Sequence, residues 1–388
     1  TCVDPLYTNV RYLRVYETQI TELFDLAGAT NILEIWASRS KITLLPNETH
    51  VPASNQIEKI DLAENLITNL PVTFTKNLVT LKFLYLHENK IIAPFPEFFF
   101  SELNSLEELT LDQNMIPGNL TCNTGLNQTN ALRKLTLAYN KITSILGCFF
   151  TNMTKLNFFT IDRNELSEIT NDTRFVPGNT ITSIDLQYNK LTYIPESFFF
   201  SNTYFVDTIE LKKNQLVLMP NLQLLPSFRI LKKFGAHYNK IIELKKHFLA
   251  GLEKLEEFDL RNNKLTQLPV TGLGSPNALN NLLFSSNSIV SVNWTMFMVN
   301  MTSLTLLDMN KNKLTHLDGH LCTPGQNFPL SKIFFDSNDI IWISKDFLDS
   351  CHHVTVLYLA ANNLLETFPY VGNSKGSLEE LKVNYNII

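Results

Sequence analysis

The chain has 388 residues, of which 44% are hydrophobic and 18% are charged, so it can bury a large core and is not a disordered chain. Its formal net charge of −5 argues against nucleic-acid binding and against attachment to a membrane surface through a basic patch. No run of 18 or more apolar residues occurs, so no membrane span is expected.

A short motif recurs from one end of the chain to the other. Residues 106–116 read LEELTLDQNMI, residues 132–142 read LRKLTLAYNKI, and residues 255–265 read LEEFDLRNNKL. Each fits L-x-x-L-x-L-x-x-N-x-L, the leucine-rich repeat signature. Its Asn position, called the Asn slot below, is held by Thr18 and Ser40 in two degenerate first copies. The later slots are Asn65, Asn89, Asn114, Asn140, Asn164, Asn189, Asn214, Asn239, Asn263, Asn287, Asn312, Asn338, Asn362 and Asn386.

The spacing of these slots predicts the fold. Successive slots lie 22 to 26 residues apart, mostly 24 or 25, which leaves no room for a linker. We therefore expect one leucine-rich repeat domain over residues 1–388, a solenoid of class α/β. It has about 16 repeats of 24–25 residues, a single curved parallel β-sheet and little regular helix.

Alternation within each repeat separates core from surface. Leu135 and Leu137 of one short strand point into the core, and Thr136 between them points outward. The outward positions therefore lie six, four, two and one residues before each Asn slot. The large rings of the second half of each repeat are also expected in the core; they include Phe150, Phe199 and Phe297.

The first repeats place an unusual number of aromatic side chains at outward positions. Aromatic residues and Arg carry much of the binding energy in protein interfaces, so we interpret this group as a partner-binding site. Contact with an N-terminal cap is the alternative. The group, called the aromatic patch below, is Tyr12, Arg14, Tyr16, Trp36, Phe83, Tyr85 and His87.

The middle repeats carry outward acidic residues interleaved with Lys and Arg, and a pair of cysteines in phase. The acidic residues are Asp112, Asp162, Asp185 and Glu210; they form either an ordinary solvated face or a site for a basic peptide. Cys122 and Cys148 each lie eight residues after an Asn slot. Equal phase puts them one rung apart, within disulfide reach, although two reduced core thiols remain the alternative.

The last repeats show three features. Phe334 and Tyr358 are adjacent at outward positions and extend the candidate binding surface. Cys322 and Cys351 lie in neighbouring repeats, three positions out of phase, and form a second possible disulfide. The chain ends on a consensus block without a cysteine-rich cap, so we expect a fragment whose residues 378–388 form an open edge able to self-associate.

Seven Asn-x-Ser/Thr sequons occur, and all are expected on loops rather than strands. They are candidate glycosylation sites in a secreted chain. The residues are Asn47, Asn119, Asn127, Asn152, Asn171, Asn293 and Asn300.

No arrangement of residues points to catalysis. Phosphate loops, nucleophile elbows and metal-spaced cysteine pairs are missing, and the pair His352 and His353 favours a surface role over a metal site. We therefore expect no enzyme activity, no cofactor and no metal site.

Over residues 10–388 the chain resembles extracellular leucine-rich repeat proteins of typical repeat length, such as Toll-like receptor ectodomains, Slit-type guidance proteins and small-proteoglycan-type matrix proteins. The resemblance implies an extracellular or cell-surface module that binds a protein or peptide, of receptor or adhesion type. Two alternatives stay open: a structural matrix protein that assembles through its open end, and an intracellular scaffold with reduced cysteines and unmodified sequons.

Overall fold

The computed structural model describes residues 9–23, 30–45, 51–176, 179–199, 205–219, 229–270, 272–274, 276–322, 324–325, 328–365 and 377–387. The chain forms two compact units, Thr1–Thr203 and Tyr204–Ile388, called the N-terminal and C-terminal units below. One continuous domain over residues 1–388 stays a prediction.

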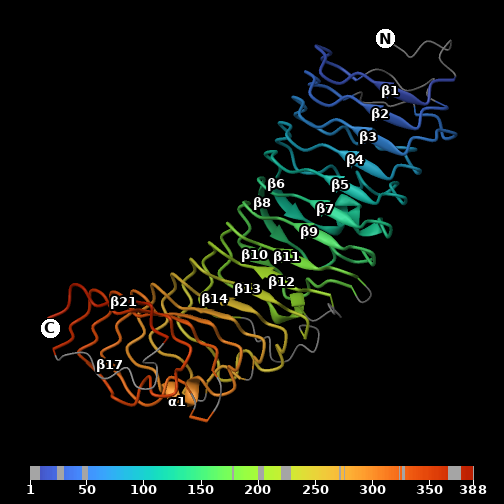
Figure 1. The fold of residues 1–388 in the computed structure, drawn as a ribbon. Helices are drawn as coiled ribbons and strands as arrows, with labels where there is room; N and C mark the ends of the chain where they lie inside the picture. Colours follow the sequence, from blue (N-terminus) through green and yellow to red (C-terminus); the bar gives the residue numbers. More distant parts are fainter. Residues whose placement is uncertain are drawn as a thin grey trace. The chain divides into compact units, whose positions relative to one another are not determined.

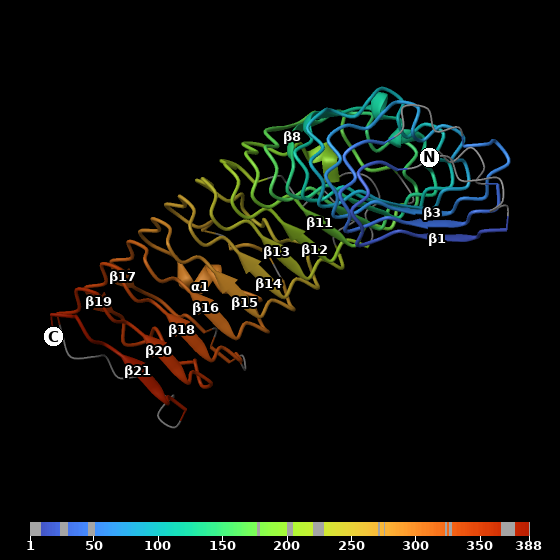
Figure 2. The ribbon, with the colours of Figure 1, turned by 90° about the horizontal axis from the view of Figure 1, so that it is seen from above.

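Each unit contributes eight parallel strands of the predicted kind, one per repeat, among the residues described. Those of the N-terminal unit are β1 (Tyr12–Arg14), β2 (Glu34–Trp36), β3 (Lys59–Asp61), β4 (Phe83–Tyr85), β5 (Glu108–Thr110), β7 (Lys134–Thr136), β9 (Phe158–Thr160) and β11 (Ser183–Asp185). Those of the C-terminal unit are β12 (Thr208–Glu210), β13 (Lys233–Gly235), β14 (Glu257–Asp259), β15 (Asn281–Leu283), β16 (Leu306–Asp308), β18 (Lys332–Phe334), β20 (Val356–Tyr358) and β21 (Glu380–Lys382). Figures 1 and 2 show how the strands of each unit follow one another, and the predicted leucine-rich repeat solenoid is confirmed.

The second half of the repeats contains little regular structure, as predicted, but it adds two small parallel sheets. One consists of β6 (Pro117–Leu120), β8 (Lys141–Ile145) and β10 (Glu168–Ile169), and the other of β17 (His316–Leu317) and β19 (Trp342–Ile343). Helix in the described residues is limited to α1 (Trp294–Phe297) and to 3₁₀ turns at Cys122–Thr124, Leu126–Gln128 and Glu196–Phe199.

Inward side chains form the core. Leu135 and Leu137 are fully buried, as the alternation predicts. Phe150 is buried too, and its ring centroid lies 4.4 Å from that of Phe175 and 5.1 Å from that of Phe159. The surplus of phenylalanine therefore fills the core between neighbouring repeats.

The Asn slots hold neighbouring repeats together. The Asn140 amide nitrogen donates to the carbonyl oxygen of Leu137 in its own repeat (3.1 Å) and to that of Leu111 in the preceding repeat (2.9 Å). Its amide oxygen accepts from the Ile116 backbone N–H at 3.0 Å. One buried side chain thus satisfies backbone groups that would otherwise lack partners in two successive repeats.

The residue immediately before each slot lies in the left-handed region of backbone space. At Ala361, for example, φ is 53°. A left-handed conformation costs a residue with a Cβ roughly 1–2 kcal/mol, so the rest of the repeat must impose it. The residues in this column are Glu17, Arg39, Glu64, Glu88, Gln113, Tyr139, Arg163, Tyr188, Lys213, Tyr238, Asn262, Ser286, Lys311, Ser337, Ala361 and Tyr385.

Both predicted cysteine pairs are joined as disulfides. Cys122 and Cys148 have Cα atoms 5.4 Å apart, and those of Cys322 and Cys351 are 5.3 Å apart. The two bonds link successive repeats, the first in the N-terminal unit and the second in the C-terminal unit.

The sequons do not all lie on loops. Asn119 lies on β6, because the segment after the Asn slot forms a strand there, so the expectation of loops alone is wrong at this site. Asn127 is half-buried, whereas the remaining described sequon residues are exposed. Those exposed residues are Asn119, Asn152, Asn171, Asn293 and Asn300. Asn47 falls outside the described residues.

The last strand of the C-terminal unit, β21, is exposed. All three residues of β21 are exposed, and Leu381 at its centre is 41% exposed although its position is inward. Self-association through residues 378–388 stays a prediction. In the described part of the chain, no helix is long and apolar enough to cross a membrane.

Adjacent alanines allow a test of the left-handed column. Ala361→Gly is expected to raise the stability by up to about 1 kcal/mol, because glycine adopts positive φ without a Cβ clash. Ala360→Gly, one residue earlier and outside the positive-φ set, is expected to lower it by about 0.5–1 kcal/mol. Thermal unfolding of both variants provides the measurement, and equal destabilisation by the two would contradict the assignment.

Candidate functional site

The aromatic patch lies on the outward face of the first strands of the N-terminal unit. Its residues come from β1, β2, β4 and the turns that follow β1 and β4, which the repeat spacing brings into neighbouring columns. Tyr12 and Tyr16 are about half exposed, at 53% and 51%. Trp36, Tyr85 and His87 are half-buried. The predicted outward orientation is therefore observed for the whole group.

A lysine that sequence reasoning missed organises the patch. The Lys59 ammonium lies 3.5 Å from the ring centroid of Trp36 and 4.8 Å from that of Tyr85. The strand register explains why Lys59 reaches both rings, because β3 lies between β2, which carries Trp36, and β4, which carries Tyr85. Asp61 lies on β3 as well. A cation over an aromatic face is attracted by the ring quadrupole, so Lys59 orders both rings.

The polar groups of the Trp36 and Tyr85 rings lie in different environments. The Trp36 indole N–H donates to Glu34 at 2.8 Å. Burial, with a smaller contribution from the charges of Glu108 and Asp61, raises the pKa of Tyr85 to about 12. The Tyr85 hydroxyl therefore stays neutral at physiological pH and offers a hydrogen bond rather than a charge.

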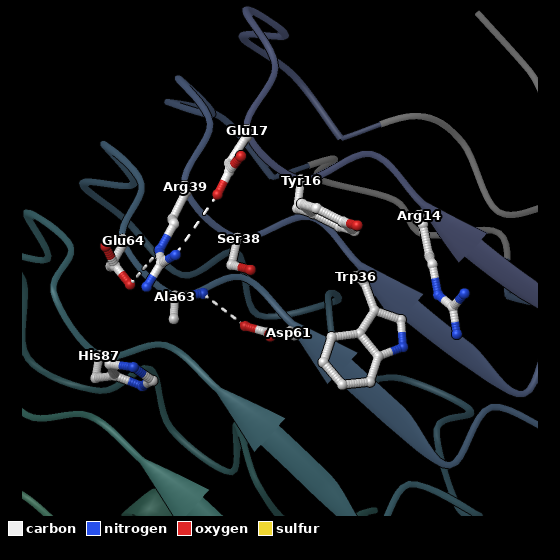
Figure 3. Close-up of a pocket in the computed structure, with 10 residues that line it drawn as sticks. All are labelled: Arg14, Tyr16, Glu17, Trp36, Ser38, Arg39, Asp61, Ala63, Glu64 and His87. Carbon is white, nitrogen blue, oxygen red and sulfur yellow. Dashed lines mark hydrogen bonds and ion pairs between the residues drawn. The ribbon is translucent and has the colours of Figure 1, made fainter.

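A hollow of about 440 Å³ opens beside these rings. Figure 3 shows its lining, which includes Arg14, Tyr16, Trp36 and His87 of the aromatic patch. Ser38 and Ala63 also line it, and their short side chains leave space between the larger neighbours.

Two carboxylates and one guanidinium close one side of the hollow. Arg39 donates to Glu64 at 2.9 Å and lies 3.5 Å from Glu17. All three belong to the left-handed column, which stacks them in successive repeats. The Arg39 charge is therefore already compensated.

Asp61 is the buried charged group of the hollow. It is only 8% exposed, and one of its oxygens accepts a hydrogen bond from the Ala63 backbone N–H at 3.2 Å. Its neighbours across the sheet are Trp36 on β2 and Tyr85 on β4, whose side chains account for its burial.

The acidic residues of the middle repeats are bonded within the chain. The Asp112 carboxylate accepts from the Thr136 hydroxyl and from the Ala138 backbone N–H. Asp185 accepts from both the backbone and the side-chain nitrogen of Gln187, each at 3.0 Å. Both carboxylates are partly buried, and the choice between an ordinary solvated face and a site for a basic peptide stays a prediction.

The other two acidic candidates also have partners in their own units. Asp162 accepts from the Thr160 hydroxyl at 2.7 Å, and Glu210 forms an ion pair with Lys233 at 2.9 Å. All four acidic candidates therefore have hydrogen-bond or ion-pair partners within the chain.

Two further aromatic groups contact neighbouring side chains, and the first of them, Phe334 and Tyr358, is adjacent as expected. The Phe334 and Tyr358 rings are 4.9 Å apart, and the Lys382 ammonium lies 3.6 Å from the Tyr358 ring centroid. In the left-handed column, the Arg163 guanidinium lies 4.8 Å from the Tyr139 ring and 4.0 Å from the Tyr188 ring. In both groups the cation and the rings lie in one column of neighbouring repeats.

Comparison with known proteins agrees with the repeat architecture. The leucine-rich repeat family models match residues 55–116 and 254–276. Mouse podocan is 27% identical over 272 residues, which are 68% of this chain and 41% of podocan. Human lumican is 30% identical over 170 residues, which are 42% of this chain and 46% of lumican. The chain thus spans less than half the length of these two relatives.

Solved structures show the same fold. The Toll–Spatzle complex of Drosophila matches with a TM-score of 0.62 at 19% identity and covers 91% of this chain and 50% of that chain. A leucine-rich repeat protein of Leptospira interrogans matches with a TM-score of 0.59 at 20% identity and covers 92% and 91%. The chain is therefore a leucine-rich repeat solenoid protein, and its resemblance to Toll-type and small-proteoglycan-type repeats is confirmed.

The partly buried carboxylates make stability depend on pH. Burial raises the pKa of Asp185, so the folded state binds its proton more tightly than the unfolded state does. The unfavourable contribution of the ionised group is therefore present at neutral pH and disappears as pH falls through the raised pKa. We expect Asp185→Asn to raise the midpoint of thermal unfolding at pH 7, by an amount that shrinks toward pH 4.

An exposed carboxylate supplies the matched control. The Lys190 ammonium lowers the pKa of Glu165 through a hydrogen bond and its charge, so ionisation of Glu165 favours folding. Glu165→Gln should therefore give no increase at pH 7. A pH-independent effect of Asp185→Asn would refute burial of its charge as the cause.

Proposed function

We propose that the chain is an extracellular recognition module of receptor or adhesion type that binds a protein or peptide through the aromatic patch. The observation that carries this proposal is the gathering of exposed and half-buried rings on one outward face of the N-terminal unit. Such groups mark interaction sites on soluble proteins, and their residue types are those that dominate binding energy. The mechanism is presentation of side chains on a preformed sheet.

The comparisons support a protein partner. The Toll–Spatzle structure is that of a complex, and its likeness to this chain extends to the repeat fold. Podocan and lumican resemble this chain in sequence over long stretches, which supports the proposed extracellular setting. The two disulfides favour an oxidising compartment over an intracellular scaffold.

Binding through the aromatic patch is tested by truncating its two central rings. Trp36→Ala combined with Tyr85→Ala is expected to weaken partner binding by ~2 kcal/mol or more, because buried aromatic anchors dominate interfaces. Proteins of the extracellular fluid of the source organism, captured on immobilised chain, supply the partner, and its affinity is then measured by calorimetry. Trp342→Ala is the control, since Trp342 is an exposed tryptophan on β19 of the other unit. Equal binding by the double variant and the control would refute the site.

The extracellular setting is tested by the intact mass before and after removal of N-linked glycans. A large loss of mass is expected, and the exposed sequon residues should carry it. Asn127 should be modified least, because its amide oxygen is buried. An unchanged mass would favour the intracellular scaffold.

A further inference from the structure

One short contact recurs after several strands of both units. An Asp at the last position of a strand accepts a hydrogen bond from the backbone N–H two residues later. The contact is made from Ala63 to Asp61 (3.2 Å), from Gln187 to Asp185 (3.0 Å), from Arg261 to Asp259 (3.0 Å) and from Asn310 to Asp308 (3.1 Å). It fixes one carboxylate oxygen against the turn and leaves the other to the side chains around it.

In two of these turns, the residue that supplies the N–H also satisfies the second oxygen. The Gln187 amide donates to Asp185 at 3.0 Å. The Arg261 guanidinium donates to both oxygens of Asp259, at 3.0 Å and 2.7 Å. Asp259 is only 2% exposed, and the Arg261 guanidinium, whose side chain is 40% exposed, compensates its charge.

Asp61 lacks that partner. The corresponding residue is Ala63, which has no side-chain donor, and no hydrogen bond or ion pair reaches the second Asp61 oxygen from the described residues. Yet Asp61 is more than nine-tenths buried. The unbonded oxygen keeps contact with solvent at the hollow, so it can accept a charge-assisted hydrogen bond from an incoming cation.

The missing side chain also supplies the space. Ala63 lines the hollow of about 440 Å³. In the equivalent turn of the C-terminal unit, Arg261 occupies the position of Ala63 and its guanidinium fills the corresponding space beside Asp259. Figure 3 shows Asp61 beside Ala63 and between the walls formed by Trp36 and His87. The hollow therefore combines an acceptor, room and flat aromatic surfaces.

We propose that this hollow binds the guanidinium of an arginine side chain from the partner, which deepens and rests on the proposed function. The guanidinium donates in its plane to Asp61, as Arg261 does to Asp259. Its face packs on an aromatic wall, as Arg163 packs on Tyr188 within this chain. Arginine fits both demands better than lysine, whose compact ammonium lacks a planar fork.

Small probes test the proposal directly. Acetyl-arginine amide is titrated against acetyl-citrulline amide, which is close in shape but neutral, and against the lysine and glutamate analogues. The chain has three tryptophans, so fluorinated tryptophan gives three NMR signals. The Trp36 signal should shift with arginine, while buried Trp294 and exposed Trp342, both of the C-terminal unit, report non-specific effects.

The expected order is arginine above lysine, with citrulline and glutamate not binding. Equal binding of citrulline or lysine would overturn the proposal. Preferred binding of glutamate would overturn it too, and would assign the hollow to an anion held by Arg14 and Lys59 instead.

Two variants connect the probe to the assigned contacts. Asp61→Asn keeps an acceptor for the Ala63 N–H but removes the charge, and it should weaken arginine binding by about tenfold or more. Asp185→Asn, in an equivalent turn whose oxygens are both occupied, should leave binding unchanged. Thermal unfolding checks that both variants fold.

Ala63→Arg is the sharper variant. It supplies the guanidinium from within the chain, as in the Asp259 turn, and should abolish probe binding without loss of thermal stability. Persistent binding to folded Ala63→Arg protein would overturn the proposal.

Failure of this inference can be told from failure of the proposed function. If arginine does not bind but the partner still depends on Trp36 and Tyr85, the inference falls and the proposed function stands. If arginine binding is lost on Asp61→Asn but no partner depends on the two rings, the hollow is confirmed and the proposed function falls.

Discussion

The structure of both units depends on the buried amide that closes the repeats from Asn65 onward. At Asn263 the amide nitrogen donates to Leu260 in its own repeat and to Ala236 in the preceding one, while the oxygen accepts from Ile241. The bonds to the preceding repeat span 22 to 24 residues for the amide oxygen and 27 to 29 for the amide nitrogen, so the amide ties each turn to the turn before it. The same turn requires a left-handed conformation at the residue before the Asn slot, which is unfavourable for a residue with a Cβ. A leucine-rich core without such amides would leave backbone groups buried and unpaired at every turn.

This arrangement determines how much of the molecule could be predicted. Leu135, Leu137 and Phe150 were assignable because alternation and repeat length alone decide whether they face inward. The cysteines were assignable because equal or near-equal phase means spatial adjacency in a solenoid. The outward columns were assignable for the same reason. Position in the repeat thus determines the backbone and the direction of each side chain.

The contacts that outward side chains make with one another could not be predicted from position in the repeat. Lys59 stood between two aromatic positions in the sequence pattern, but its placement over both rings depends on rotamers and on the side chains beside it. Asp61 and Asp185 occupy the same column and looked equivalent. They differ because Gln187 supplies a donor and Ala63 does not. The strand at Asn119 escaped prediction because β6 forms by pairing with β8 rather than through a pattern of its own.

The disulfides have a consequence for how the chain comes apart. A solenoid loses structure from its ends inward, because a terminal repeat has a neighbour on one side only. Cys122–Cys148 and Cys322–Cys351 each fasten two successive repeats in the second half of the repeat, where the chain has little regular structure. Fraying that reaches such a pair must release two repeats at once rather than one. Each disulfide therefore limits unfolding from the end of its own unit. A single cut between the two cysteines of one disulfide leaves the two pieces covalently joined.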